Sequence, residues 1–157
     1  MRSIRFGAAV AAIVVILALP AGAAATQPEP VTITVATDLG RFENTFDATG
    51  GLVCAMGTVS TLGGGPTGDT RTFNGGQSFA QAQLLLSQRF ECPDGSFDVL
   101  LRVTLDFATG DTVGTWSVLG GTGAYASLHG AGSLTGDRVA PTDPTILDTY
   151  TGYVHVD

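Results

Sequence analysis

The chain has 157 residues, of which 44% are hydrophobic, and its formal net charge is -7 because 14 acidic residues outnumber 7 arginines and there is no lysine. Such an acidic chain repels phosphate backbones and anionic membrane surfaces, which argues against nucleic-acid and lipid-headgroup partners. The length fits one domain with one hydrophobic core.

The first residues have the features of a secretory signal peptide. After two arginines, residues 6–19 form an uncharged apolar run, and the small residues that follow Pro20 permit cleavage after Ala23 or Ala25. A membrane-spanning helix needs about 20 apolar residues, more than this run offers. We therefore expect residues 1–25 to be removed and the protein to be secreted without a membrane anchor.

The mature part of the chain is predicted to form a single domain. Five arginines remain against fourteen acids after removal of the signal, a net charge of -9. Residues 26–30 contain two prolines and are expected to form a flexible tail before the domain at 31–157. The Pro/Gly stretches inside the domain are too short to be interdomain linkers.

Both cysteines, Cys54 and Cys92, lie in the exported part, where oxidising conditions favour a disulfide. Such a bond would stabilise the fold by about 4 kcal/mol in the chain-entropy model. A zinc site with His129 and His155 as further ligands is the alternative, but no Cys-x-x-Cys or His-x-x-x-His spacing preorganises these side chains. We predict a Cys54–Cys92 disulfide, no metal and no cofactor.

Apolar residues recur at every second position along most of the domain, as is typical of strands with one buried face. The clearest strand is 97–107, in which apolar residues alternate with polar ones such as Arg102, whose side chain should face water. Further strands are expected at residues 31–35, 52–60, 112–119, 128–136 and 146–156.

Residues 78–92 are ambiguous between helix and strand. Their Ala, Gln and Leu content favours a helix, whereas period two places apolar side chains on one face and polar ones on the other. We choose a strand because residues 93–95, Pro-Asp-Gly, form a turn that would pair it with 97–107. The glycine-rich residues 62–76 are expected to form a flexible loop.

These strands predict an all-β fold. With about eight strands and no helix to cover them, the sheet must bury its apolar face on itself, and closure also removes exposed edges. We predict a small antiparallel closed barrel with one disulfide. A β-sandwich is the alternative, since it uses the same alternation, but strands of ten or more residues suit the tilted, coiled sheet of a barrel.

Residues 116–136 predict a strand, a glycine-dense corner and a second strand. Gly120, Gly121 and Gly123 would occupy positive-φ or crowded positions, with Tyr125 and Leu128 packed inward as a plug. The corner also fits the loose dinucleotide fingerprint Gly-x-Gly-x-x-Ala, but no helix of useful length follows to hold a pyrophosphate. We expect no nucleotide site there.

The same corner resembles a known superfamily. Residues 116–125 (WSVLGGTGAY) and 128–132 (LHGAG) are similar to the core motif of the dirigent and allene-oxide-cyclase-like barrels. Residues 54–59 (CAMGTV) and 92–95 (CPDG) resemble small secreted bacterial proteins of that superfamily. The resemblance spans roughly residues 31–156.

This resemblance implies an eight-stranded, calycin-like barrel. The plant members guide radical coupling or cyclise an unstable oxide inside the barrel, and the bacterial group has no activity that can be carried over. The plant catalytic acids and gating residues find no motif in this chain, so the plant activities remain an analogy.

No catalytic set is evident from the sequence. His129 has no serine, cysteine or acid at a diagnostic spacing, and we expect it on the surface or at the rim. Asp106 and Asp111 flank one turn, and three further acids are expected in the last loop: Asp137, Asp143 and Asp148. Without an Asp-x-Asp-x-Asp-Gly pattern, all five are expected to form turns rather than to bind calcium.

Two functions follow from these patterns. The first is a non-enzymatic barrel that binds a small lipophilic ligand or acts as an envelope or extracellular interaction module. The alternative is an isomerase or cyclase, or a dirigent-like barrel, that guides a reactive apolar intermediate. Trp116, Tyr125 and His129 are the residues we expect to contact a ligand. A lumen filled by side chains would argue against both hypotheses that use the lumen, ligand binding there and catalysis there.

Overall fold

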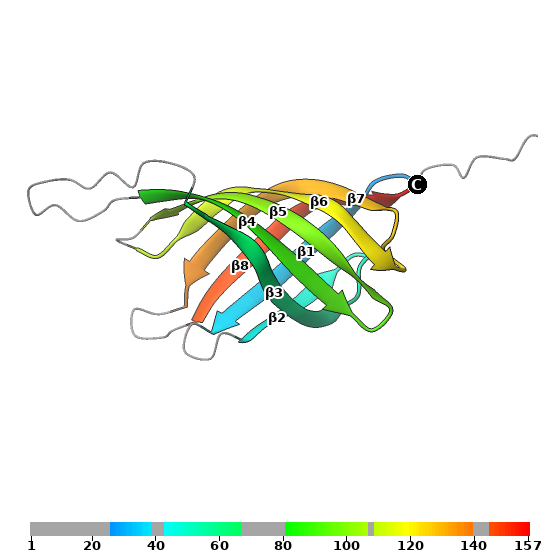
Figure 1. Ribbon diagram of the computed structural model, residues 1–157, viewed down its shortest axis with the longest axis horizontal. Helices are drawn as coiled ribbons and strands as arrows, with labels where there is room; N and C mark the ends of the chain where they lie inside the picture. The colour runs from blue at the N-terminus through cyan, green and yellow to red at the C-terminus, as the bar shows by residue number, and fades with distance from the viewer. Residues whose placement is uncertain (1–25, 39–42, 67–80, 107–108, 140–144) are drawn as a thin grey trace, which may run out of the picture.

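The computed structural model describes residues 26–38, 43–66, 81–106, 109–139 and 145–157. They form eight strands, each antiparallel to its neighbours, and pairing of the last strand with the first closes the barrel (Figure 1). The strands are β1 (Glu29–Asp38), β2 (Glu43–Thr49), β3 (Met56–Pro66), β4 (Gln81–Cys92), β5 (Gly95–Asp106), β6 (Thr112–Gly123), β7 (Leu128–Arg138) and β8 (Thr145–Val156). The predicted closed barrel with one disulfide is confirmed, and the sandwich is excluded.

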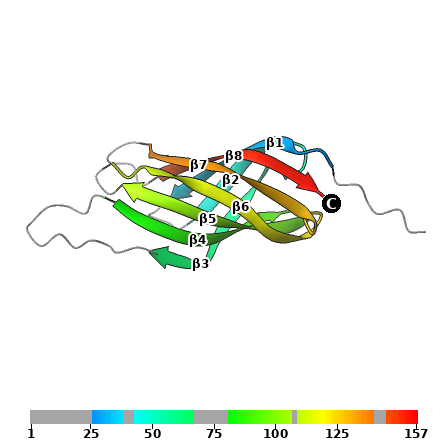
Figure 2. The same ribbon diagram turned by 90° about the horizontal axis from the view of Figure 1, so that it is seen from above.

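The strands follow one another around the wall in chain order, from β8 through β7, β6 and β5 to β4 and β3 (Figure 2). The described residues include no helix with the length and hydropathy of a membrane span. Ordered pairing begins before the expected start of the domain, because β1 starts at Glu29 and Thr26 donates its backbone N–H to the Val156 carbonyl at 2.8 Å.

The strand expected at 52–60 is shifted along the chain. Residues 52–55 belong to the β2–β3 connection. Because β3 continues to Pro66, the predicted start of the glycine-rich loop at residue 62 was wrong. A register shift between Thr61 and Gly63, together with Gly64 at φ 121°, lets this glycine-rich segment go on pairing with β4. Residues 67–76 lie outside the described part of the chain.

β4 confirms the choice of strand over helix for its described residues. It forms a hairpin with β5 through a two-residue turn, since Cys92 pairs with Gly95. Ala82 and Phe90 are buried, as the alternation predicts, and Gln88 is buried on the same inward face. Positions 78–80 lie outside the described residues.

Aromatic side chains fill the middle of the barrel around Phe90. Its ring stacks on Phe97 with 4.9 Å between centroids, and the edge-on neighbours Phe46 and Tyr150 lie at 5.1 and 5.7 Å. The Tyr150 hydroxyl donates to Gln88 Oε1 at 2.7 Å, which satisfies the phenol in this dry interior. The apolar side chains that the alternation in β5 and β6 places inward are all at most 6% exposed: Phe97, Val99, Leu101, Val103 and Trp116.

The corner between β6 and β7 plugs one end of the barrel. Tyr125 and Leu128 are 4% and 1% exposed, as predicted. Gly123 takes φ 59°, and a Cβ on Gly121 would lie 2.7 Å from the Ser96 carbonyl oxygen, so both positions require glycine. Residues 124–127 form turns rather than a helix, which removes the structural context of a nucleotide fingerprint.

Candidate ligand-binding site at the plugged end

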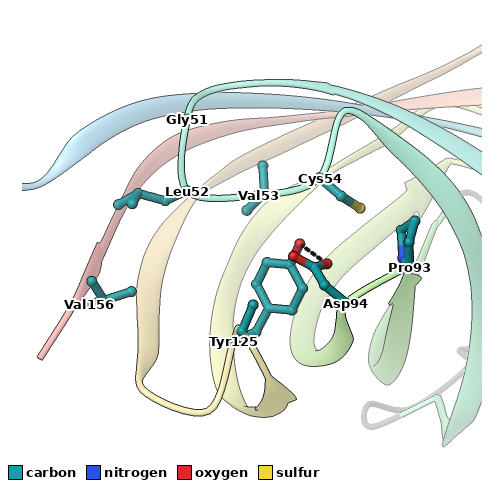
Figure 3. Close-up of a pocket in the computed structure, with 9 residues that line it drawn as sticks. Gly51, Leu52, Val53, Cys54, Pro93, Asp94, Tyr125 and Val156 are labelled. Atoms are coloured by element: carbon teal, nitrogen blue, oxygen red, sulfur yellow. Dashed lines mark hydrogen bonds between the residues drawn. The ribbon is translucent and has the colours of Figure 1, made fainter.

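A hollow of about 580 Å³ lies at the plugged end, where three connections meet the last strand. In Figure 3 the β2–β3 loop passes over the Tyr125 ring, and Asp94 lies beside the ring with its carboxylate next to the hydroxyl. Its lining comes from four parts of the chain: Gly51, Leu52, Val53, Cys54, Pro93, Asp94, Ala124, Tyr125 and Val156. The volume falls within the range of pockets that take small molecules.

The disulfide holds the loop that forms one wall of the hollow. Cys54 in this loop is bonded to Cys92 at the end of β4, with 6.0 Å between the Cα atoms. The loop is also closed on itself, because the Ala48 N–H donates to the Ala55 carbonyl at 2.7 Å. Leu52 and Val53 are thereby presented to the hollow from a loop that has no regular pairing of its own.

A hydrogen-bonded pair provides the polar part of the hollow. The Tyr125 hydroxyl donates to Asp94 Oδ1 at 2.9 Å (Figure 3), and the Ala124 N–H donates to the Asp94 carbonyl at 3.1 Å. The Tyr125 ring lies 5.5 Å from Phe97, which ties the plug to the aromatic core. Asp94 is therefore both the turn residue of the β4–β5 hairpin and the acceptor that orients Tyr125.

Burial raises the pKa of Tyr125 to about 12, with the hydrogen bond and negative charge of Asp94 acting in the same direction and the Cys54 backbone in the opposite one. The phenol therefore stays protonated near neutral pH and serves as a hydrogen-bond donor. Among the lining residues, the Asp94 carboxylate is the group beside it that could accept a proton, and it is hydrogen-bonded to the phenol rather than to a nucleophile. The arrangement is chemically suited to binding.

Trp116 lies inside the barrel wall rather than at the hollow. It is 3% exposed and donates its indole N–H to the Thr151 carbonyl at 3.3 Å. Gly132 and Gly152 make room for its ring, since a Cβ on either would come within 2.8 Å of indole atoms. These two glycines are register partners on β7 and β8, so together they leave a surface without side chains against which the indole ring packs.

His129 lies on the outer face of the barrel, as expected for a surface histidine. It pairs in register with His155, the two rings are 5.3 Å apart, and its Nε2 lies 3.0 Å from Asp157 Oδ2. The three expected contact residues thus occupy three different places, and of these only Tyr125 lines the hollow. Within the described ranges, no group of three His, Cys, Asp or Glu side chains is arranged to hold a metal ion.

The turn acids divide into two kinds. Asp106 is a turn former, because its Oδ1 accepts the Thr109 N–H at 3.4 Å. Asp137 and Asp148 were expected in the last loop and this was wrong, since Asp137 lies in β7 and Asp148 lies in β8, where it pairs with Gly136. Asp143 lies outside the described residues.

Asp148 is a half-buried acid that the sequence analysis placed in a turn, although it shares the alternation of Tyr150. Its Oδ1 accepts the Thr112 hydroxyl at 2.9 Å across Gly136, where a Cβ would overlap both side chains. Burial raises the pKa of Asp148, and the negative charge of Asp137 adds to this, while the Thr112 hydrogen bond opposes it. The folded state therefore disfavours the charged form of this carboxyl group.

Asp148→Asn should raise the melting temperature at neutral pH, because the amide keeps the acceptor for Thr112 and removes a poorly solvated charge. A carboxyl pKa raised by folding means that the wild type loses stability as pH rises through that pKa. The gap between variant and wild type should therefore close as pH falls towards about 4. Thermal melts followed by circular dichroism check this, and a variant that melts below the wild type at neutral pH contradicts it.

Comparison of the chain with family models, curated proteins and solved structures gives no match.

Proposed function

We propose that this protein is an exported, non-enzymatic barrel that binds a small, largely apolar molecule in the hollow at its plugged end. The observation that carries the proposal is the hollow of about 580 Å³ between the disulfide-held loop and the Tyr125–Asp94 pair. Such pockets bind by apolar walls with a few placed polar groups, which is the composition of this lining.

Two observations support binding over the alternative of an isomerase, cyclase or dirigent-like barrel. The central lumen is packed with aromatic rings around Phe90, whereas guiding a reactive intermediate would need space there. At the hollow itself, Tyr125 is held protonated and faces a single carboxylate. The lining supplies this one phenol and one carboxylate, and the phenol proton is directed at Asp94 rather than into the hollow, so the pair positions no proton donor for a substrate.

Export and family membership are parts of the same proposal. The disulfide is consistent with an extracytoplasmic location, where such bonds persist. The closed eight-stranded barrel is the architecture that the resemblance to allene-oxide-cyclase-like proteins implies. We propose that the protein belongs to the secreted bacterial group of that superfamily.

The proposal is tested by filling the hollow. N-phenyl-1-naphthylamine, an uncharged apolar fluorophore, should bind the wild type with enhanced emission. Ala124→Phe should weaken this binding by at least about tenfold, because the ring would occupy the space a ligand needs. Ala126→Phe adds the same ring to the same turn at an exposed position outside the lining, and it should bind as the wild type does.

Native mass spectrometry of protein isolated from its own secretion medium gives a second readout. A bound small molecule that is lost in Ala124→Phe and kept in Ala126→Phe would support the site. The absence of fluorophore binding in the wild type, or equal binding in both variants, would remove the hollow as the ligand site.

A further inference from the structure

The polar side chains that line the hollow differ in what they leave free for a ligand, an acceptor or a donor of hydrogen bonds. Asp94 and Tyr125 are the only described lining residues with polar side chains, apart from the disulfide-bonded Cys54. The Tyr125 hydroxyl proton is already donated to Asp94 Oδ1, and Asp94 Oδ2 has no hydrogen-bond partner among the described residues. The side chains of the hollow therefore present a free acceptor and no free donor.

A second acid stands at the rim of the hollow. A Cβ built on the lining residue Gly51 would lie 3.3 Å from Glu29 Oε2, which places this carboxylate against the loop. Asp157 follows the lining residue Val156, but its carboxylate faces His129 at 3.0 Å and His155 at 3.9 Å. Asp94 and Glu29 thus leave negative charge at this end.

The described arginines do not offset that charge. Arg89 is held by Asp98 through two hydrogen bonds of 2.8 and 2.9 Å on the wall of the barrel. Arg138 ends β7 at the opposite end and lies beside Gly110, and Arg102 faces outward from β5. A ligand carrying a positive charge would therefore meet a carboxylate whose Oδ2 is free, without a competing cation among these arginines.

We infer that the ligand of this hollow is a cationic amphiphile, with an apolar body and an amine or quaternary ammonium group. This inference rests on the proposed function and adds the ligand class. The apolar body lies against Leu52, Val53 and Val156, and the cation meets Asp94 Oδ2. Tyr125 is the positioning residue, because its hydrogen bond fixes the carboxylate before the ligand arrives.

Three probes with one decyl chain and different charge test the ligand class: decyltrimethylammonium, decyldimethylamine oxide and decanoate, each below its micelle concentration. Titration calorimetry at neutral pH should give the tightest binding for the cation, about tenfold tighter than for the uncharged oxide, and the weakest for the anion. Binding of the oxide reports on the hollow itself, and the difference between oxide and cation reports on Asp94.

Asp94→Asn removes the charge and keeps an oxygen acceptor for Tyr125, so the fold should persist, as a thermal melt will verify. It should remove the roughly tenfold preference for the cation while leaving the oxide unchanged. Asp47→Asn makes the same change of net charge at an exposed outward position on β2 and should keep the preference.

The outcomes separate the two proposals. If the oxide binds but the cation binds no tighter, or if Asp47→Asn lowers the preference as much as Asp94→Asn does, the ligand class is wrong and the hollow remains a neutral apolar site. If none of the three probes binds, the proposed function itself fails.

Discussion

Replacement of both cysteines, Cys54→Ala with Cys92→Ala, should lower the free energy of unfolding by about 4 kcal/mol. The bond joins positions 38 residues apart, and its loss restores the chain entropy of that loop to the unfolded state. Against a total of about 5–15 kcal/mol for a domain, this is a large share of the stability. Urea unfolding followed by circular dichroism measures it.

The same variant separates the role of the bond in folding from its role in the site. The β2–β3 loop would lose its covalent tie to β4, so binding of N-phenyl-1-naphthylamine should weaken even where the barrel is still folded. Reduced wild type is the matched control and should unfold at the same urea concentration as the double variant. A loss below about 1 kcal/mol would mean that the unfolded state is already constrained in this region.

Much of the barrel was predictable because its strands alternate strictly. β5 places Phe97, Val99 and Leu101 inward and Arg102 outward, as the sequence pattern requires. The corner at Tyr125 was predictable for a different reason, since consecutive glycines next to one aromatic indicate a tight backbone over a buried ring. Local patterns of this kind are complete within a few residues.

The features that were missed have non-local causes. β2 was not predicted, because Phe46 is its one large apolar side chain and the other residues apart from Ala48 are polar. Gln88 and Asp148 look like outward residues by type, yet each finds a partner on a distant strand, Tyr150 for the first and Thr112 for the second. A polar residue in an inward register position is the signal that could have found them.

The hollow could not be predicted from the sequence. It forms where connections after β2, β4 and β6 meet at one end of the barrel, and the closure of β8 against β1 brings these connections and the end of β8 around one space. The surroundings of Trp116 also depend on residues that are distant in the sequence. Its aromatic character pointed to a ligand, but glycines on two neighbouring strands accommodate it as a core residue.

Phe90→Ala should cost about 3–5 kcal/mol of unfolding free energy, the range for removing a fully buried aromatic ring. Its ring is 0% exposed and contacts three aromatic neighbours, Phe46, Phe97 and Tyr150, on three different strands. Because those strands are fixed by hydrogen bonds around the closed wall, the barrel has little freedom to collapse into the space. The cavity term should therefore be near its upper limit.

Val113→Ala serves as the control, since Val113 is 57% exposed on the outer face of β6 and should cost less than about 1 kcal/mol. Urea unfolding of both variants measures the difference. If Phe90→Ala remains folded, the cavity left by the ring should take up benzene, as apolar cavities in protein cores do. Adding Ala124→Phe should not block that uptake, because the hollow at the plugged end is a separate space. A cost below about 2 kcal/mol would contradict the packed lumen on which the assignment of the ligand to the plugged end depends.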